Sequence, residues 1–132
     1  MKLILLFSRQ DRHTSVSERI LLDIQNGIHT EVYSSTATIQ EIIFWLYNQG
    51  LHRETIEAVN ALSHLKNIEW VPITPETCLK AAILVERYGL SPFDAYHAAT
   101  ALDRDAFILS TDHAYDRVKN ITRIPPEDLV KE

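Results

Sequence analysis

The chain has 132 residues, of which 45% are hydrophobic, and a formal net charge of −5 from 18 acidic and 13 basic residues. This length fits one domain over residues 1–132, and the apolar content is ordinary for a globular protein. The negative charge argues against a protein whose whole surface attracts nucleic acid. A cluster of acids that holds cations can still offer phosphate a positive site.

The single cysteine, Cys78, excludes an internal disulfide, and no cysteine–histidine spacing indicates structural zinc. We predict that Cys78 is an inert thiol buried in a helix, in a protein of the reducing cytosol. No segment has the length of a membrane helix, so no membrane partner is expected.

In chain order, the first half predicts three helices with apolar residues at helical spacing and two short strands bounded by polar residues or proline. These are helices at 14–26, 37–49 and 52–66 and strands at 31–34 and 68–71. Ser35 or Thr36 is suited to cap the second helix. The inward positions of the second and third helices are expected to be Ile39, Ile42, Ile43, Leu46, Ile56, Val59 and Leu62.

The second half contains two strong helix starts. Thr74 followed by Pro75, and Ser91 followed by Pro92, each combine an N-cap residue with a proline suited to the first helical position. The expected elements are helices at 75–88 and 92–102, strands at 106–110 and 121–124, and a helical turn from His113 between those strands.

Helices that alternate with short apolar strands indicate an α/β fold with a mainly parallel sheet covered on both faces. Ligands of such folds gather at the carboxyl ends of the strands. Asp112 follows the strand at 106–110, so it lies where a functional acid is expected.

Two further acids have suggestive positions. Glu41 adjoins the apolar stripe of the helix that follows the first clear strand, and Asp94 opens an alanine-rich helix that can pack closely. Each acid also has a structural interpretation, because an acid in the first turn of a helix usually serves the helix dipole and an acid after a strand usually serves a turn.

Three segments resemble the PIN-domain family and occur in its order. The segment 34–41 (SSTATIQE) resembles the family's strand and helix that lead to a metal-binding Glu. The segment 91–101 (SPFDAYHAATA) resembles its third acidic motif, and 107–118 (FILSTDHAYDRV) resembles its last motif, a strand followed by Thr-x-Asp. The resemblance covers roughly residues 10–126 and is closest to the VapC-type toxin branch of compact endoribonucleases.

The resemblance implies a PIN-like three-layer α/β/α sandwich and an endoribonuclease that depends on Mg²⁺ or Mn²⁺ held by acids at one edge of the sheet. It assigns Glu41, Asp94 and Asp112 as catalytic metal ligands. Asp116, four residues after Asp112, is expected to face the same way as an auxiliary ligand. Ser110 or Thr111 either orients a carboxylate or a metal-bound water, or merely caps a turn.

The same resemblance implies an RNA substrate and an antitoxin partner, while the single cysteine favours a cytoplasmic location. Arg117 and Lys119 are the basic residues that we expect first to contact RNA phosphates. An aromatic group could stack RNA bases, although packing in a core or dimer is the commoner use. This group is Phe44, Trp45 and Tyr47. His97 is expected to hydrogen-bond a neighbour rather than to bind metal.

The start of the chain departs from the family pattern. The family's first strand ends in an Asp, whereas residues 1–7 contain no acid. In one interpretation, residues 3–7 form that strand and Ser8 replaces the Asp. In the other, which we favour, residues 1–7 correspond to the helical turn after a missing Asp, and the chain starts late in the domain. Asp11 is a poor substitute for the missing acid because of its loop position.

The favoured interpretation leaves the sheet without its central strand, which would expose strand edges and favour dimerisation. Loss of one acid also weakens metal binding. The alternative function is therefore a catalytically degenerate PIN-like protein that binds RNA or a partner protein. A different phosphate-processing enzyme is disfavoured, because the sequence has no Walker loop, Gly-rich nucleotide motif or Asp-x-Asp motif.

Overall fold

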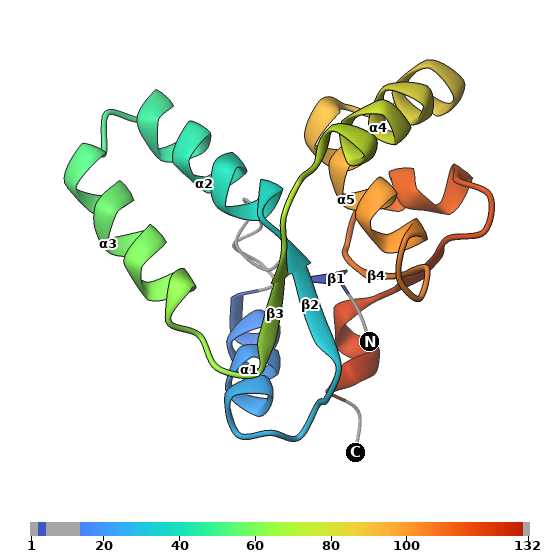
Figure 1. The fold of residues 1–132 in the computed structure, drawn as a ribbon. Helices are drawn as coiled ribbons and strands as arrows, with labels where there is room; N and C mark the ends of the chain where they lie inside the picture. Colours follow the sequence, from blue (N-terminus) through green and yellow to red (C-terminus); the bar gives the residue numbers. More distant parts are fainter. Residues whose placement is uncertain (1–2, 5–13, 131–132) are drawn as a thin grey trace.

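In the computed structural model, which describes residues 3–4 and 14–130, five parallel strands form one sheet in the order β3-β2-β1-β4-β5 (Figure 1). The strands are β1 (Leu3–Ile4), β2 (Val32–Ser35), β3 (Ile68–Val71), β4 (Phe107–Leu109) and β5 (Thr122–Ile124). The predicted parallel sheet is confirmed, and its strand order reverses between β1 and β4.

In the part of the chain that the structure describes, five α-helices and two short 3₁₀ helices connect and follow these strands. They are α1 (Thr14–Gln25), α2 (Ala37–Asn48), α3 (His52–Ser63), α4 (Pro75–Tyr88), α5 (Pro92–Leu102), η2 (His113–Arg117) and η3 (Pro126–Leu129). The predicted caps of α4 and α5 are confirmed. The Thr74 hydroxyl accepts a hydrogen bond from the Thr77 amide at 3.2 Å, and the Ser91 hydroxyl accepts one from the Asp94 amide at 3.4 Å.

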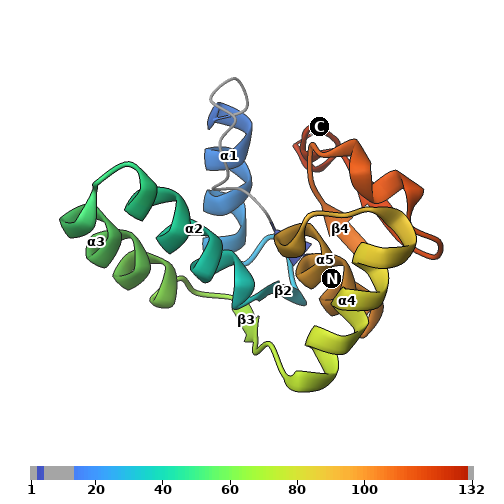
Figure 2. The ribbon, with the colours of Figure 1, turned by 90° about the horizontal axis from the view of Figure 1, so that it is seen from above.

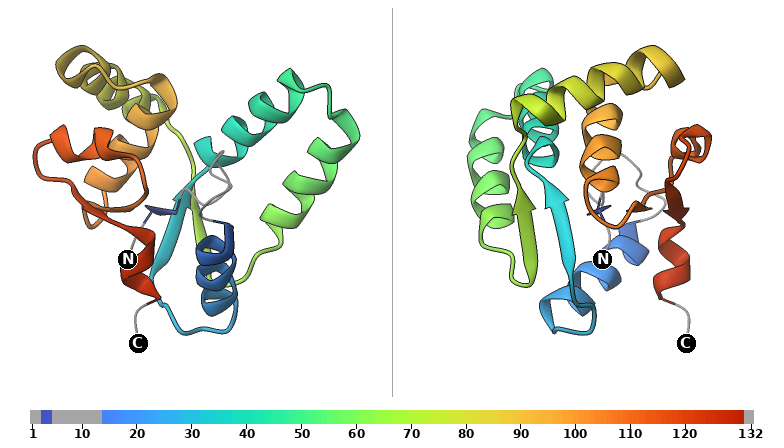
Figure 3. Two further views of the ribbon diagram at one scale, coloured as in Figure 1. Left: turned by 180° about the vertical axis from the view of Figure 1, so that it is seen from behind. Right: turned by 45° about the vertical axis from the view of Figure 1, so that its right-hand side comes forward.

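Alternation along the strands divides the core between the two faces of the sheet. Tyr33 and Ile108 pack with residues of α4, α5 and η2, whereas their neighbours Val32 and Leu109 pack with α1 and η3. The hairpin of α2 and α3 has its own apolar contacts. Figures 2 and 3 show α1, α2 and α3 on one side of the sheet and α4 and α5 on the other, which confirms the predicted three layers.

The favoured interpretation of the N-terminus is wrong. Leu3 and Ile4 form β1, the central strand, which pairs with β2 through Leu3–Tyr33 and with β4 through Leu3–Ile108 and Ile4–Leu109. A short apolar run suits a helix or a strand equally, and pairing on both sides decides for the strand. Ser8 and Asp11 lie outside the described residues. The argument that a missing central strand favours dimerisation loses its basis.

Three side chains that were expected to be buried are exposed. Ile56 is 72% exposed and Ile43 is 40% exposed, because the α2–α3 hairpin packs through a narrow stripe that includes Leu46 and Leu62. Cys78 is also exposed, on the outer face of α4, so the prediction of a buried thiol is wrong. Among the helices that the structure describes, none is long and apolar enough to cross a membrane.

Candidate active site

Three different elements carry the predicted acids toward the carboxyl ends of the strands. Glu41 lies one turn into α2, which follows β2 directly. Asp94 lies in the first turn of α5, and Asp112 follows β4 and caps η2. In an open parallel sheet, ligands bind at this edge, near the point where the strand order reverses. The sheet therefore places the three acids in the region where a site is expected.

Asp94 is held by a buried tyrosine. The Tyr115 hydroxyl, on η2, donates a hydrogen bond to Asp94 Oδ1 at 3.1 Å, and Tyr115 itself is 0% exposed. Burial raises the pKa of Asp94, and the negative charge of Asp112 raises it further, while hydrogen bonds with Ser91 and Tyr115 oppose the shift. The site thus keeps Asp94 in an environment that disfavours its negative charge. Functional carboxylates often lie in environments of this kind.

Glu41 is held by a buried histidine. His97 Nε2 lies 3.2 Å from Glu41 Oε1, and the side chains of His97 and Glu41 are 1% and 17% exposed. His97 Nδ1 is buried without a hydrogen-bond partner among the described residues. The prediction that His97 hydrogen-bonds a neighbour is confirmed, and the neighbour is one of the three acids.

Asp112 is fixed by the turn that it begins. Its Oδ1 accepts a hydrogen bond from the Ala114 amide at 2.9 Å, and its own amide donates to the Ser110 hydroxyl at 3.0 Å. The Ser110 hydroxyl therefore belongs to the turn that orients Asp112. Thr111 is half-buried in the same turn.

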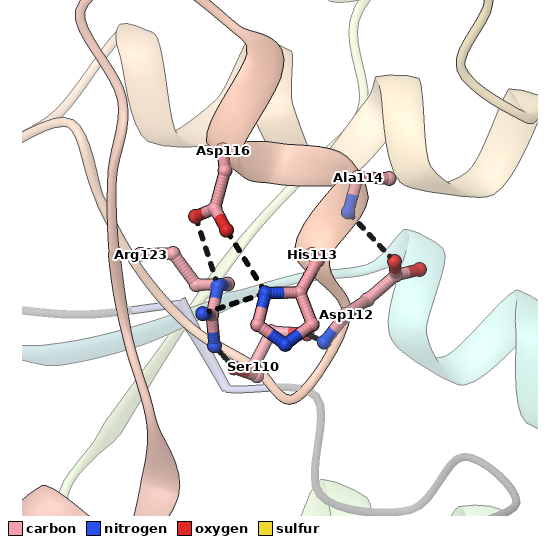
Figure 4. Close-up of polar contacts among 6 residues, drawn as sticks. All are labelled: Ser110, Asp112, His113, Ala114, Asp116 and Arg123. Carbon is pink, nitrogen blue, oxygen red and sulfur yellow. Dashed lines mark hydrogen bonds and ion pairs between the residues drawn. The ribbon is translucent and has the colours of Figure 1, made fainter.

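Asp116 has a different environment (Figure 4). Its two oxygens lie 3.0 Å from Arg123 Nε and 3.0 Å from His113 Nδ1. Arg123 also donates to the Ser110 carbonyl at 3.0 Å, so β5 braces the loop that leads to Asp112. The hydrogen bond from Arg123 and then that from His113 lower the pKa of Asp116. In Figure 4, its carboxylate and that of Asp112 point to opposite sides.

The negative charges of the three acids all act on one group, the hydroxyl of Tyr115. Burial raises the pKa of Tyr115 well above its usual value, and the charges of Asp94, Asp112 and Glu41 add to this shift. Carboxylate oxygens are the hard ligands that Mg²⁺ and Mn²⁺ prefer. Among the side chains that the structure describes, no group of three or more His, Cys, Asp or Glu residues is placed to hold a metal ion. A smaller set of one or two carboxylates is still chemically suited to Mg²⁺, which in proteins usually keeps several of its own water ligands.

The predicted RNA contacts lie on the surface beside this region. Arg117 ends η2 and Lys119 follows it, and both are exposed. The aromatic group of α2 is also exposed, so it does not pack in the core of the chain. Its members are Phe44 (58% exposed), Trp45 (44%) and Tyr47 (64%).

An apolar hollow of about 310 Å³ lies between α1 and the α2–α3 hairpin. Leu21, Trp45, Leu62 and Leu65 contribute to its lining. No prediction from the sequence had anticipated this surface.

Sequence reasoning missed two residues of the site, Tyr115 and Arg123. Tyr115 lies three residues after Asp112, at a spacing typical of one helix face, but nothing distinguishes it from an ordinary core aromatic. Arg123 acts on Asp116 and Ser110 from a neighbouring strand, and that contact has no signal in the local sequence.

Comparisons with known proteins agree with this geometry. A family model described as PIN domain matches residues 3–121. A solved toxin–antitoxin complex from Klebsiella pneumoniae is similar with a TM-score of 0.57 and 16% identity, over 92% of this chain and 88% of that chain. VapBC2 from Rickettsia felis, bound to a DNA fragment from its promoter, is similar with a TM-score of 0.66 and 13% identity, over 91% and 92%. No curated protein sequence matches the chain.

Proposed function

Because the chain belongs to the PIN domain family, we propose that it is a Mg²⁺- or Mn²⁺-dependent endoribonuclease that hydrolyses RNA through Glu41, Asp94 and Asp112. The observation that carries this proposal is the placement of the three acids at the carboxyl ends of the strands, where the buried Tyr115 hydroxyl donates a hydrogen bond to Asp94. Such a concentration of negative charge at the ligand-binding edge of a sheet attracts cations.

Asp94 and Asp112 are the residues that would hold the metal, with Glu41 completing the negative site. A bound divalent cation supplies an activated water and positive charge against the scissile phosphate. The chain's own residues orient the acids: Tyr115 holds Asp94, His97 holds Glu41, and the η2 turn holds Asp112. Arg117 and Lys119 are proposed to contact the RNA backbone, and the single cysteine suits a cytoplasmic location.

The test is cleavage of single-stranded RNA with Mn²⁺, with and without EDTA. Asp112→Asn keeps the oxygen that caps η2 but loses the charge, so we expect cleavage to fall by at least about 100-fold. Asp103→Asn, at the exposed end of α5, is the matched control and should cleave like the wild type.

Two outcomes would count against the proposal. Equal cleavage by the wild type and Asp112→Asn contradicts the assigned site. A wild-type chain that binds RNA but never cleaves it favours the alternative hypothesis, a catalytically degenerate binding module. The observation behind that alternative is that no group of three or more metal-ligating side chains among the described residues is placed to hold a metal ion.

We also propose that the chain is a VapC-type toxin whose antitoxin covers the apolar hollow beside α1. Support comes from the two solved neighbours, which are a toxin–antitoxin complex and VapBC2. The test is co-purification of the full chain with a candidate antitoxin expressed in the same cells. Trp45→Ala, which removes a lining side chain, should weaken the complex, whereas Leu22→Ala, at an exposed position of α1, should not. If both variants bind the antitoxin as tightly as the wild type, the assigned surface is contradicted.

The homodimer remains a proposal supported by exposed apolar side chains on α2 and α4, among them Phe44, Leu79 and Ile83. Light scattering of the purified chain, with and without Leu79→Glu, measures it directly. A monomeric mass for the wild type contradicts the dimer.

A further inference from the structure

Three aspartates lie near the carboxyl end of β4 or its neighbours, and they are held in two different ways. Asp94 and Asp112 accept hydrogen bonds from neutral groups, a phenol and a backbone amide. Asp116 instead forms an ion pair with Arg123. A guanidinium neutralises the carboxylate that it holds, whereas a neutral donor orients a carboxylate and leaves its charge available to a cation.

Tyr115 is placed to join two of these acids into one unit. Asp112 is the N-cap of η2, and Tyr115 lies three residues further along the same short helix. From there its hydroxyl reaches the first turn of α5 and donates to Asp94. The ring is 0% exposed and belongs to the core between η2, α5 and the sheet, so the hydroxyl has little freedom to move.

The hydrogen bond opposes a repulsion within the site. Asp112 and Asp94 carry like charges, and the charge of Asp112 disfavours ionised Asp94. A carboxylate without its donor would turn away from Asp112 or toward water, because both movements relieve that repulsion. Groups that hydrogen-bond a metal-ligating carboxylate orient it, and their removal typically costs about 10- to 100-fold in metal affinity.

We infer that Tyr115 is a positioning residue of this site: its neutral hydroxyl holds Asp94 beside Asp112 and so sets the affinity of the pair for a divalent cation. This inference rests on the proposed function, and it adds to that function a residue that is not itself an acid. Tyr115 does not bind the metal or transfer a proton in this role.

The chain offers a matched control in Tyr33, a second buried tyrosine. Tyr33 is 4% exposed, and its hydroxyl donates to Asp105 Oδ1 at 2.6 Å. Asp105 precedes β4, whereas Tyr115 follows it, so the two tyrosine–aspartate pairs lie at opposite ends of the same strand. Each Tyr→Phe variant therefore removes a hydroxyl oxygen that donates to an aspartate. Tyr115→Phe removes it within the site, and Tyr33→Phe removes it at the other end of β4.

The experiment is Mn²⁺ binding to the full chain, measured by titration calorimetry and by the electron paramagnetic resonance signal of free Mn²⁺. Tyr115→Phe should raise the Mn²⁺ dissociation constant by about 10-fold or more, whereas Tyr33→Phe should leave it within about twofold. RNA cleavage provides a second measurement. Tyr115→Phe should need more Mn²⁺ for half-maximal rate, while its KM for RNA at saturating Mn²⁺ should not change.

Each other outcome identifies which statement fails. Mn²⁺ binding by the wild type that is equally tight in Tyr115→Phe overturns the inference and leaves the proposed function standing. A wild type that binds no Mn²⁺ overturns both. Equal weakening by Tyr33→Phe assigns the effect to general stability and also overturns the inference. So does loss of the cooperative thermal transition in Tyr115→Phe, since a phenyl ring should preserve the packing.

Discussion

The two ends of strand β4 carry the same contact with opposite electrostatic consequences. Before the strand, Tyr33 donates to Asp105 at 2.6 Å, and after it Tyr115 donates to Asp94 at 3.1 Å. Asp105 has a lowered pKa, although burial opposes the shift, because it accepts hydrogen bonds from Tyr33 and the Phe107 amide. Asp94 has a raised pKa because burial and a neighbouring acid outweigh its hydrogen bonds.

The difference separates a contact that serves stability from one that serves a site. At the first end the folded state favours the charged carboxylate, so the contact stabilises the fold. At the second end the folded state holds a carboxylate that it disfavours, which is common where a charge is needed for function. The hydrogen bonds alone do not distinguish the Tyr33–Asp105 contact from the Tyr115–Asp94 contact. The distinguishing feature is the group of further acids around Tyr115.

The largest effect should come from exchanging the aspartates themselves. Asp94→Asn removes a charge of the proposed metal site, so RNA cleavage should fall by at least about 100-fold. Asp105→Asn should leave cleavage unchanged.

The melting temperatures of the two variants should change in opposite directions. The raised pKa of Asp94 means that its ionised form destabilises the fold at neutral pH, so Asp94→Asn should raise the melting temperature, whereas Asp105→Asn should lower it.

Rate assays and thermal unfolding of the two variants measure both halves of this prediction. A lower melting temperature for Asp94→Asn, or a large loss of cleavage in Asp105→Asn, would remove the distinction between the two ends.

The helices and strands around the two ends of β4 were largely predictable from the sequence, because local chemistry specifies them. As expected, α4 begins at Pro75 after the N-cap Thr74, and α5 begins at Pro92 after the N-cap Ser91. Because a strand-to-loop transition is a local event, the position of Asp112 after β4 was also predictable. The acids therefore follow from patterns within short segments.

The remainder depends on contacts between distant segments. The run at β1 was misassigned because its pairing with β2 and β4 is not visible in residues 1–7. Tyr115 and Tyr33 are both aromatic residues in apolar surroundings, and their partners are 21 and 72 residues away. Arg123 reaches Asp116 from β5. These three-dimensional contacts decide which acids keep an available charge.

A second prediction extends the comparison to the imidazole that holds Glu41. His97→Leu removes this donor together with a buried Nδ1 that has no partner among the described residues. Cleavage should fall by about 10-fold because Glu41 loses its orientation. The melting temperature should not fall, because the variant removes an unsatisfied buried polar atom.

The control is His113→Leu, at a position whose side chain is 80% exposed, and it should change neither quantity strongly. A marked drop in the melting temperature of His97→Leu would show that His97 acts mainly through packing, like the pair before β4.

A third prediction concerns Tyr33→Phe, which tests the stabilising end. The variant should lose about 1 kcal/mol of unfolding free energy near neutral pH. Since the pKa of Asp105 is lowered in the folded protein, this contribution is present above the unfolded-state value of about 3.9 and is lost as the pH falls through the folded-state value. Urea denaturation should therefore show a stability difference from the wild type at about pH 7 that shrinks toward about pH 3. A difference that grows in acid would contradict the assignment.

The smallest effect is expected at Asp116, where a cation rather than a phenol holds the carboxylate. The hydrogen bond from Arg123 lowers the pKa of this exposed group, and an asparagine can still accept that bond through its amide oxygen. Exposed ion pairs contribute little, so Asp116→Asn should change stability by less than about 1 kcal/mol.

If Arg123 already neutralises Asp116, the Mn²⁺ affinity of Asp116→Asn should stay within about twofold of the wild type. A loss of about 10-fold or more would instead make Asp116 the auxiliary ligand that its spacing from Asp112 predicts. It would also mean that pairing with a guanidinium does not remove an acid from the site, and the distinction between neutral and cationic partners would then fail.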